Sequence, residues 1–168
     1  NNANPLAFMI KALSETLKEF PIFNSSLIEN NQIVLKDYIN IGIAVDTEEG
    51  LVVPVIQNAD KLSLEEISTK VKELAEKARN KKLLNTNLVN RTITVSSLGK
   101  LGGTGFTPII NPPDVAIVSM SKTYKRLVLA EELDIMPIAM SYDHRVINGA
   151  DAGRFMVFLK DILDNFND

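Results

Sequence analysis

The segment Val115–Met120 constrains the fold most, because five of its six residues are apolar and three of them are β-branched. A run of this length and composition predicts a buried β-strand rather than a helix. Arg91–Ser96 alternates polar and apolar side chains and predicts a half-buried strand, and Ile135–Ser141 predicts a further one. The second half of the chain is therefore expected to supply several strands.

More extended structure is expected on both sides of these strands. Ile33–Val45 is rich in β-forming residues and predicts either a hairpin or two extended segments. Leu51–Ile56 predicts another strand, and its Pro54 indicates a sheet edge or a bulge. The polar segment Lys122–Asp134 is expected to hold a turn around Glu131 and Glu132.

Three helices carry recognisable start signals. Asn4-Pro5 predicts a capped helix with proline at its first position, which Pro21 ends. Ser63 and Glu66 have the spacing of a capping box, and that helix should run to about Lys81. Asn148 is expected to cap the last helix. The apolar positions at helical spacing are Leu6, Met9, Ile10, Leu13, Leu17 and Phe20; Ile67, Val71, Leu74, Ala75 and Ala78; and Phe155, Phe158, Leu159, Ile162 and Phe166.

Runs of strands separated by isolated helices favour an α/β fold with a mixed or mostly antiparallel sheet. The chain has 168 residues, about the length of one domain, and 45% of them are hydrophobic, which is enough for a sizeable core. We therefore expect residues 1–168 to form a single domain of mixed sheet packed with helices.

Composition excludes several classes of function. The chain has no cysteine and one histidine, so disulfides, thiolate metal sites and histidine-rich metal sites are excluded within one chain. The net charge is −3 and no basic cluster occurs, which argues against nucleic-acid binding. No apolar run approaches the roughly 18 residues of a membrane span, and no signal-peptide pattern occurs. The absence of cysteine fits a reducing compartment.

Two sequence patterns invite functions that their context rejects. The glycine-rich loop Gly99–Gly105 lacks the Gly-Lys-Ser/Thr ending and the following helix of a phosphate-binding loop, so we interpret its glycines as turn formers. Asn58-Ala59-Asp60-Lys61 resembles the Asp-Lys pair that presents a lipoylated lysine. Because Lys61 precedes a capped helix and not a hairpin tip, we interpret it as an ordinary surface lysine.

His144 is the one side chain whose charge ordinarily changes near neutral pH. It is either a general base or a hydrogen-bonded structural residue at a strand end. The nearby helix N-terminus and Arg145 both favour a neutral imidazole, which can accept a proton. Capping alone would explain Asn148, and Asp143 with Arg145 is most simply a local ion pair. Ser96 and Ser97, on pattern alone, are turn formers.

Three motifs resemble those of one known family. Asp143-His144-Arg145-Val146-Ile147-Asn148-Gly149 is similar to the His-Arg-x-x-Asp/Asn-Gly signature of dihydrolipoyl acyltransferases, whose catalytic domains are related to chloramphenicol acetyltransferase. The segment from Thr92 through Ser96-Ser97-Leu98-Gly99 to Pro113 resembles the serine loop of the same family. A weaker likeness covers residues 43–56. The motifs occur in the family's order and span nearly the whole chain.

The resemblance implies the chloramphenicol acetyltransferase-like fold and a mechanism. His144 would remove the proton from the coenzyme A thiol, and Ser96 would donate a hydrogen bond to the oxyanion of the tetrahedral intermediate. Asn148 stands where most members have aspartate, so it can orient a neighbour but cannot stabilise imidazolium by charge. Asp143 and Arg145 would support the site. Coenzyme A and a lipoyl group carried on another domain would be the substrates, and no metal is implied.

The resemblance also implies partners and an assembly. Members form the core of 2-oxoacid dehydrogenase complexes as homotrimers that build cubic or icosahedral shells, with decarboxylase and dihydrolipoyl dehydrogenase components attached. The active site lies between subunits. The location would be the cytoplasm, or the mitochondrial matrix of a eukaryote. The segment that usually begins the catalytic domain, the lipoyl domain and the peripheral-subunit-binding domain are not in this sequence.

Acetyl transfer serving pyruvate dehydrogenase is the activity that the serine loop favours. The alternatives are a self-assembling scaffold without catalysis, a succinyl- or branched-chain transferase, and an acyltransferase for a free small molecule. Asp143 before His144, instead of the His-His pattern, argues against the last.

Overall fold

The computed structural model describes residues 4–99 and 103–166. Three α-helices, eleven β-strands and four 3₁₀ helices follow one another in the described part. In chain order they are α1 (Pro5–Glu19), η1 (Pro21–Asn24), β1 (Ser25–Ile28), η2 (Glu29–Asn31), β2 (Gln32–Leu35), β3 (Ile41–Ile43), β4 (Val45–Thr47), β5 (Gly50–Val52), β6 (Val55–Ile56), η3 (Ala59–Lys61), α2 (Leu64–Arg79), η4 (Asn85–Asn87), β7 (Ile93–Ser97), β8 (Ala116–Met120), β9 (Tyr124–Val128), β10 (Glu131–Ile135), β11 (Ile138–Tyr142) and α3 (Gly149–Asp164).

A five-stranded sheet with the order β11-β8-β7-β3-β6 forms the centre of the fold. β7 runs parallel to β3 and to β8, whereas the outer strands β11 and β6 pair antiparallel with their neighbours. The sheet is mixed, so the predicted fold class is confirmed.

Two of the three inner strands, β7 and β8, contribute a large part of the core. All five residues of β8 are buried, as predicted for this apolar run. In β7, Ile93, Thr94 and Val95 are buried in succession, so the prediction of a half-buried strand is wrong there. The reason lies at Thr94, the polar member of this alternation: its hydroxyl donates a hydrogen bond at 2.6 Å to the carboxylate of Asp114, which is itself fully buried.

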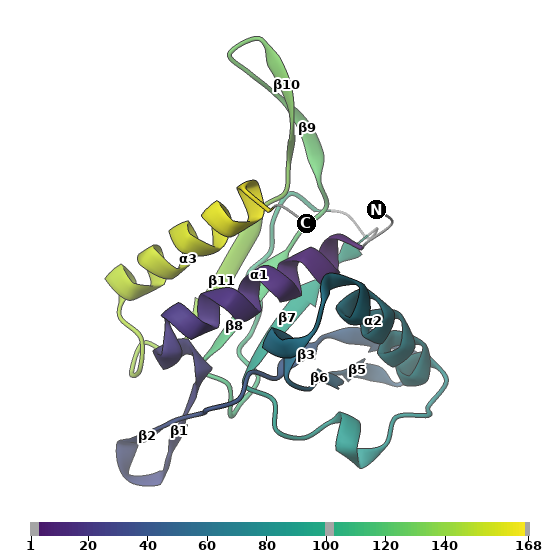
Figure 1. Ribbon diagram of the computed structural model, residues 1–168, viewed down its shortest axis with the longest axis vertical. Coiled ribbons are helices and arrows are strands. Elements are labelled where there is room, and N and C mark those ends of the chain that lie inside the picture. Colours follow the sequence, from purple (N-terminus) through teal and green to yellow (C-terminus); the bar gives the residue numbers. More distant parts are fainter. Residues whose placement is uncertain (1–3, 100–102, 167–168) are drawn as a thin grey trace.

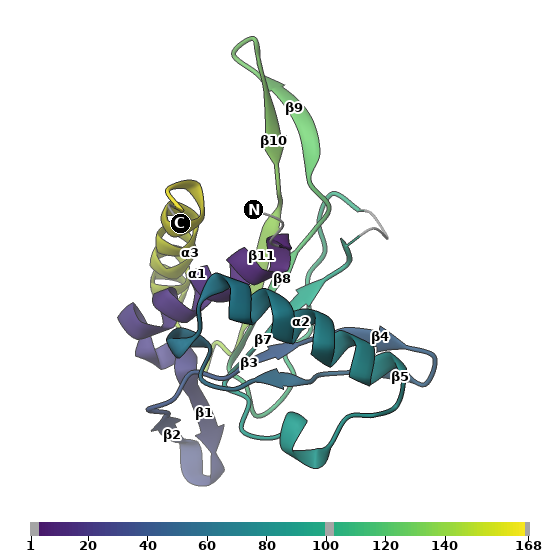
Figure 2. The ribbon, with the colours of Figure 1, turned by 45° about the vertical axis from the view of Figure 1, so that its right-hand side comes forward.

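The three α-helices cover one face of this sheet, with α1 packed between α2 and α3 (Figures 1 and 2). Their inward residues join the strands in one hydrophobic core. Within it the rings of Phe23 and Phe155 stack with centroids 4.1 Å apart. In α3, Phe155 and Leu159 are fully buried, but Phe158, predicted to face inward, is 36% exposed. Ile162 and Phe166 are half-buried.

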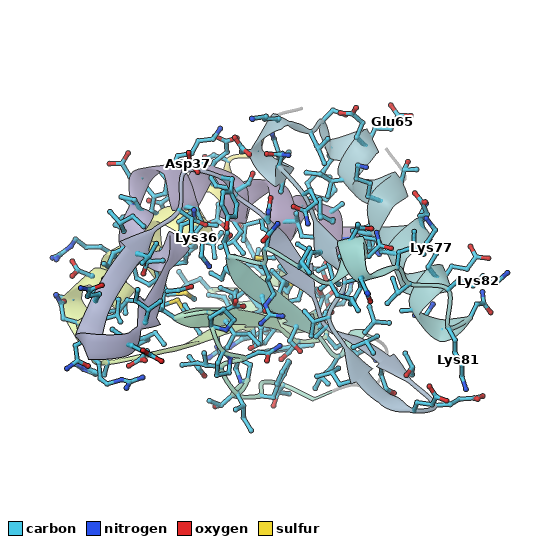
Figure 3. The ribbon with its side chains drawn as sticks, turned by 90° about the horizontal axis from the view of Figure 1, so that it is seen from below. Lys36, Asp37, Glu65, Lys77, Lys81 and Lys82 are labelled. Carbon is cyan, nitrogen blue, oxygen red and sulfur yellow. The ribbon has the colours of Figure 1, made fainter. Side chains whose placement is uncertain are left out.

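The helix start signals are confirmed. The Asn4 side chain accepts a hydrogen bond from the Leu6 amide at 3.1 Å. Ser63 and Glu66 form the reciprocal capping box, and this hydrogen bonding lowers the pKa of Glu66. α2 ends at Arg79, two residues earlier than predicted, and Lys81 adopts a left-handed conformation after it. Lys77, Lys81 and Lys82 project from this end of the helix (Figure 3).

Strand pairing differs from the predictions in the first third of the chain. β2 pairs with β1, which the sequence did not reveal, so a hairpin within residues 33–45 is wrong and two separate extended segments are present. The predicted strand Leu51–Ile56 is divided at Pro54 into β5 and β6, which pair with different partners. Pro54 precedes the edge strand β6, as its lack of an amide donor led us to expect.

The hairpin of β9 and β10 projects well beyond the body of the molecule (Figure 1). Its turn lies at Leu129 and Ala130, both with positive φ, and not at Glu131 and Glu132 as predicted. Ile135 ends β10, and the strand predicted over Ile135–Ser141 begins only at Ile138. None of the helices in the described residues is long and apolar enough to cross a membrane.

Candidate active site

A tight turn after β11 presents His144. The Asp143 amide donates to the Val115 carbonyl oxygen at 2.8 Å, and the Asp143 carbonyl oxygen accepts from the Val146 and Ile147 amides, each at 3.0 Å. The Asp143 carboxylate in turn accepts a hydrogen bond from the Arg145 amide at 3.0 Å. His144 is therefore carried on a turn that the backbone and side chain of Asp143 fix from three directions.

Asp143 and Arg145 form the ion pair that the sequence predicted. The Arg145 guanidinium donates through Nε at 3.0 Å and through Nη2 at 2.7 Å to the two carboxylate oxygens. This hydrogen bonding lowers the pKa of Asp143 and raises the pKa of Arg145. The carboxylate thus stays ionised and holds the turn, rather than serving as an acid.

The His144 side chain is exposed. Its ring lies against Tyr142, with centroids 5.6 Å apart and the planes tilted by 42°. The hydrogen bonds of the described residues include none to the imidazole. Within them, His144 is therefore not the hydrogen-bonded structural residue that the sequence offered as an alternative. An exposed imidazole on a fixed turn is able to accept a proton from a substrate.

Asn148 caps α3. Its Oδ1 accepts from the Asp151 amide at 2.9 Å, and its amide group donates to the Asp151 carboxylate. The predicted cap is confirmed. The Asp151 carboxylate accepts its hydrogen bond from the side-chain amide of Asn148 and not from the backbone amide. The start of α3 and the turn before it are consequently joined into one rigid unit.

Ser96 and Ser97 end β7, and their hydroxyl groups differ. Ser97 Oγ accepts a hydrogen bond from the Gly99 amide at 3.3 Å, which is a turn-forming role. Over residues 4–99 and 103–166, Ser96 Oγ has no such protein partner. Ser96 is half-buried, and its hydroxyl is therefore available to donate to a substrate oxygen.

The strand registers place Ser96 far from His144 within one chain. Ser96 lies opposite Ser119 in β8, and Ser119 lies opposite Ala139 in β11. His144 follows five residues after Ala139, in the direction away from the Ser96 end. At about 3.3 Å per residue and 4.8 Å per strand, the two side chains are separated by on the order of 20 Å. The structure brings Asp143, His144, Arg145 and Asn148 together, but not Ser96.

A connector, residues 106–113, lies between the end of β7 and the start of β8 and so links the two ends of the sheet. It leaves the glycine-rich loop, where Gly99 and Gly103 have the positive φ expected of them; residues 100–102 of that loop lie outside the described part. The hydroxyl of Ser119 donates to the Phe106 carbonyl oxygen at 3.1 Å, and that of Ser141 donates to the Pro108 carbonyl oxygen at 2.5 Å. Sequence reasoning overlooked both serines, because strand serines carry no signal of their own.

The connector ends at a small cleft beside the histidine turn. The cleft has a volume of about 190 Å³ and is lined by Leu27, Ile110, Pro112, Pro113, Asp114, Val115, Asp143 and Arg145. Its walls include the two neighbours of His144 in the sequence. The cleft therefore adjoins the imidazole-bearing turn rather than the serine end of the sheet.

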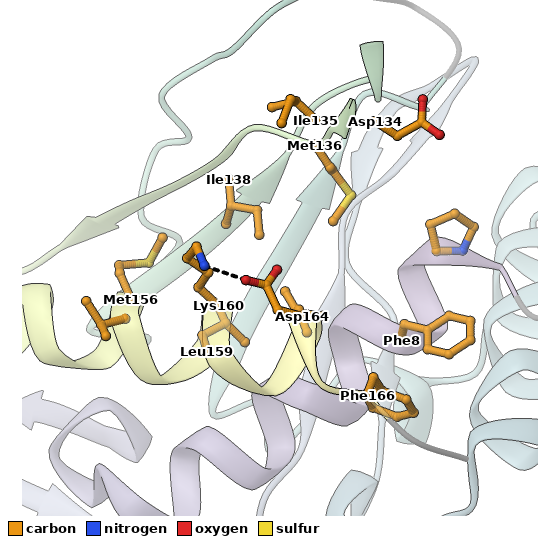
Figure 4. Close-up of a pocket in the computed structure, with 13 residues that line it drawn as sticks. Phe8, Asp134, Ile135, Met136, Ile138, Met156, Leu159, Lys160, Asp164 and Phe166 are labelled. Atoms are coloured by element: carbon orange, nitrogen blue, oxygen red, sulfur yellow. Dashed lines mark hydrogen bonds and ion pairs between the residues drawn. The ribbon is translucent and has the colours of Figure 1, made fainter. Parts of the chain in front are cut away.

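A larger apolar pocket of about 830 Å³ lies elsewhere, between the start of α1, the base of the β9–β10 hairpin and α3 (Figure 4). Phe8, Ile138 and Leu159 are among its walls, and Lys160 pairs with Asp164 at its rim. The residues described around it include neither a histidine nor a serine. It offers hydrophobic contact but no acid–base group suited to neutral pH.

Two further sequence interpretations can be placed. Lys61 ends η3, separated by two residues from the start of α2 and not at a hairpin tip, and it is exposed, as the sequence predicted. In the described part of the chain, no group of three or more histidine, cysteine, aspartate or glutamate side chains is arranged to hold a metal ion.

Comparison with known proteins relates this geometry to a family. Residues 1–168 match the 2-oxoacid dehydrogenases acyltransferase (catalytic domain) family. The chain is 49% identical over 166 residues to the dihydrolipoyllysine-residue acetyltransferase component of the pyruvate dehydrogenase complex of Cupriavidus necator, covering 96% of this chain and 30% of that protein. The chain thus spans about a third of the length of this curated relative.

Solved structures give the same picture. A crystal structure of Azotobacter vinelandii dihydrolipoamide acetyltransferase, from a study of the role of a serine, a histidine and an asparagine in its catalytic mechanism, is 46% identical with a TM-score of 0.94, covering 98% of this chain and 70% of that one. The cubic core of the pyruvate dehydrogenase multienzyme complex is similar to the same degree and over the same shares. Chloramphenicol acetyltransferase, at 17% identity and a TM-score of 0.65 over 94% of this chain and 77% of that one, shares the fold alone. The chloramphenicol acetyltransferase-like fold is thereby confirmed.

Proposed function

The chain belongs to the family of 2-oxoacid dehydrogenase acyltransferase catalytic domains, and we propose that it moves an acetyl group between S-acetyl-dihydrolipoamide and coenzyme A. The observation that carries the proposal is the presentation of His144. The chain's only histidine is exposed on a turn fixed by Asp143, beside a capped helix start. The similarity to acetyltransferases of pyruvate dehydrogenase complexes supports acetyl as the acyl group.

The proposed reaction needs one base and one oxyanion donor. His144 takes the proton from the coenzyme A thiol, and the resulting thiolate attacks the carbonyl carbon of the acetyl thioester. The negative charge that develops on the carbonyl oxygen accepts a hydrogen bond from Ser96. When the tetrahedral intermediate collapses, the C–S bond to the lipoyl group breaks, and the leaving sulfur takes the proton from the imidazolium. The reverse transfer uses the same groups.

Because His144 and Ser96 lie at opposite ends of the sheet, we propose that each site is completed by two chains. His144 of one subunit faces Ser96 of its neighbour in a homotrimer. Asn148 is assigned a supporting role through hydrogen bonding, since its amide carries no charge. The relative solved as a cubic core supports trimers that assemble further into the core of a multienzyme complex. Decarboxylase and dihydrolipoyl dehydrogenase components are the partners that such a core serves.

Replacing His144 with alanine tests the base. We expect the rate of acetyl transfer from acetyl-CoA to dihydrolipoamide to fall by roughly 10²–10⁴-fold, the usual contribution of general-base catalysis. The thermal midpoint should stay unchanged, because the side chain is exposed. Lys82→Ala, an exposed change in the loop after α2, is the control and should transfer acetyl like the wild type. Undiminished transfer by His144→Ala would rule out the proposed base.

A scaffold without catalysis is the competing function. The observation that favours it is the small volume of the cleft beside His144, about 190 Å³. A wild-type protein that assembles in threes but transfers no acetyl group would establish the scaffold. Offering acetyl-, succinyl- and branched-chain acyl-CoA, with dihydrolipoamide and with free small-molecule acceptors, separates the remaining transferase alternatives.

A further inference from the structure

Arg91 spans the end of the sheet at which the histidine turn lies. Its side chain crosses β3 at Gly42, where an added Cβ would come within 2.3 Å of Arg91 Cδ. Glycine at this position thus leaves the space that the arginine stem occupies. The Arg91 side chain is only 11% exposed, so it is part of the packed end of the sheet and not a surface charge.

The Arg91 guanidinium binds the segment that leads into β8. Nε donates to both carboxylate oxygens of Asp114, at 3.0 and 2.8 Å. Nη2 donates to the carbonyl oxygens of Asn111 and Pro112, at 3.0 and 3.1 Å. One planar group therefore ties down both the end of the connector and the residue that precedes β8 by two positions.

Asp114 is held from other sides as well. Its side chain is fully buried and accepts a hydrogen bond from Thr94 Oγ1 at 2.6 Å. Burial raises the pKa of Asp114, while Thr94, Arg91 and the nearby Lys36 oppose that rise. A buried carboxylate that lost its arginine would destabilise the fold. A displacement of Arg91 is therefore expected to displace Asp114 as well.

Asp114 is joined to the histidine turn through Val115. The carbonyl oxygen of the next residue, Val115, accepts a hydrogen bond from the Asp143 amide, and Asp143 fixes the turn that carries His144. Asp114, Val115, Asp143 and Pro112 also share the walls of the small cleft. A continuous path of bonds and hydrogen bonds therefore runs from the Arg91 guanidinium to the imidazole.

We propose that Arg91 is a positioning residue for His144, fixing the start of β8 and through it the turn that presents the imidazole. The inference rests on the proposed function for its effect on catalysis, but its structural part stands independently. Because the same imidazole serves both directions of transfer, Arg91 affects turnover in both directions and not the binding of one substrate.

The test compares Arg91→Met, Arg91→Lys and the wild type, with Arg79→Met as a matched loss of charge on the exposed face of α2. Hydrogen exchange of the assembled protein is followed by mass spectrometry. We expect faster exchange in Arg91→Met at the amides of Asp143, Val146 and Ile147, with the Leu64–Arg79 peptide unchanged as an internal control. Arg91→Lys keeps the charge but cannot bind both the carboxylate and the carbonyl oxygens as the planar guanidinium does. Its exchange rates at these amides should lie between those of the wild type and Arg91→Met.

Kinetics provide the second readout. At a temperature well below unfolding, Arg91→Met should lower kcat by about 10- to 100-fold in both directions, the range that a small misplacement of a catalytic group produces, with little change in either KM. Arg91→Lys should recover part of this loss, and Arg79→Met should match the wild type.

Three results would overturn the inference. They are unchanged exchange at the histidine turn, a fall in thermal midpoint with normal kcat, and a rise in one KM at constant kcat. A wild-type protein without transferase activity would refute the proposed function alone, and the exchange experiment would still decide the structural part. If Arg91→Met does not fold, Arg91→Lys carries both measurements.

Discussion

Ser96 and His144 lie at opposite ends of the same five-stranded sheet, two strands apart, with Ser96 near the end of β7 and His144 just beyond β11. The parallel pairing of β7 with β8 and the antiparallel return of β11 make this arrangement unavoidable. Any reaction that uses both side chains on one substrate must therefore take them from two chains.

Subunit mixing tests that pairing. We expect His144→Ala and Ser96→Ala each to be nearly inactive, and their equimolar co-expression to restore about a quarter of the wild-type rate, because random trimers contain sites with both residues intact at that frequency. The rate is measured on the purified mixed assembly. Co-expressing His144→Ala with the double variant is the control, and recovery there, or none in the first mixture, would contradict a two-chain site.

The two serines of β7 should differ in their effect on turnover. Removing an oxyanion donor typically costs about a hundredfold or more in rate, so Ser96→Ala should lower kcat by that amount. Ser97→Ala removes only the acceptor for the Gly99 amide and should retain most of the rate. Steady-state kinetics at saturating acetyl-CoA distinguish them, and equal losses would show that the serine loop acts as a structural unit.

Asn148 has a capping role that can be separated from a catalytic one. Asn148→Ala should lower the free energy of unfolding by about 0.5–2 kcal/mol, whereas Asn148→Ser keeps a good cap and should leave it nearly unchanged. We expect turnover to fall in both variants, since serine does not replace the amide. Denaturant unfolding and kcat are measured together. Normal turnover by Asn148→Ser would reduce Asn148 to a helix cap.

The Asp143–Arg145 pair predicts a pH dependence of stability. Its hydrogen bonding lowers the pKa of Asp143 in the folded protein. The pair therefore stabilises the fold above the unfolded carboxyl value of about 3.9, and this contribution is lost as pH falls through the lower folded value. Thermal midpoints of Arg145→Met and the wild type should differ slightly at pH 7 and converge in acid. A difference that stays constant with pH would contradict the prediction.

Phe155 is expected to be the costliest position in α3. It is fully buried and stacked on Phe23, so Phe155→Ala should lower the free energy of unfolding by about 3–5 kcal/mol. Val157 on the same helix is 60% exposed, so Val157→Ala should change the free energy of unfolding by less than about 0.5 kcal/mol. Urea unfolding of both variants gives the comparison, and similar small losses would place Phe155 outside the core.

Local signals predicted the starts of the three helices well, whereas the turn that carries His144 was not predicted, because the sequence indicated only a strand end there. Asn4, Ser63 and Asn148 cap their helices by contacts within three residues, and such contacts are visible in a sequence. The apolar run of β8 needed no partner to be recognised. The family motifs added the proposed roles of His144 and Ser96, which neither spacing nor composition supplies.

Contacts between distant segments were missed for a physical reason. β1 is short and half polar, and it becomes a strand only because β2 pairs with it. Arg91 and Asp114 are 23 positions apart, and no periodicity marks two residues that meet across the end of a sheet. The turn at Leu129 and Ala130 uses positive φ at residues that seldom adopt it, so its sequence resembles that of a continuous strand.

Because Ser96 and His144 lie at opposite ends of the sheet, the proposed activity should depend on the concentration of the protein. A lone subunit carries half of each of two different sites. Dilution below the dissociation constant of the trimer should therefore abolish catalysis while each subunit stays folded. Newly synthesised chains would then be unable to transfer acetyl groups until they assemble. Assembly itself would control when the proposed activity begins.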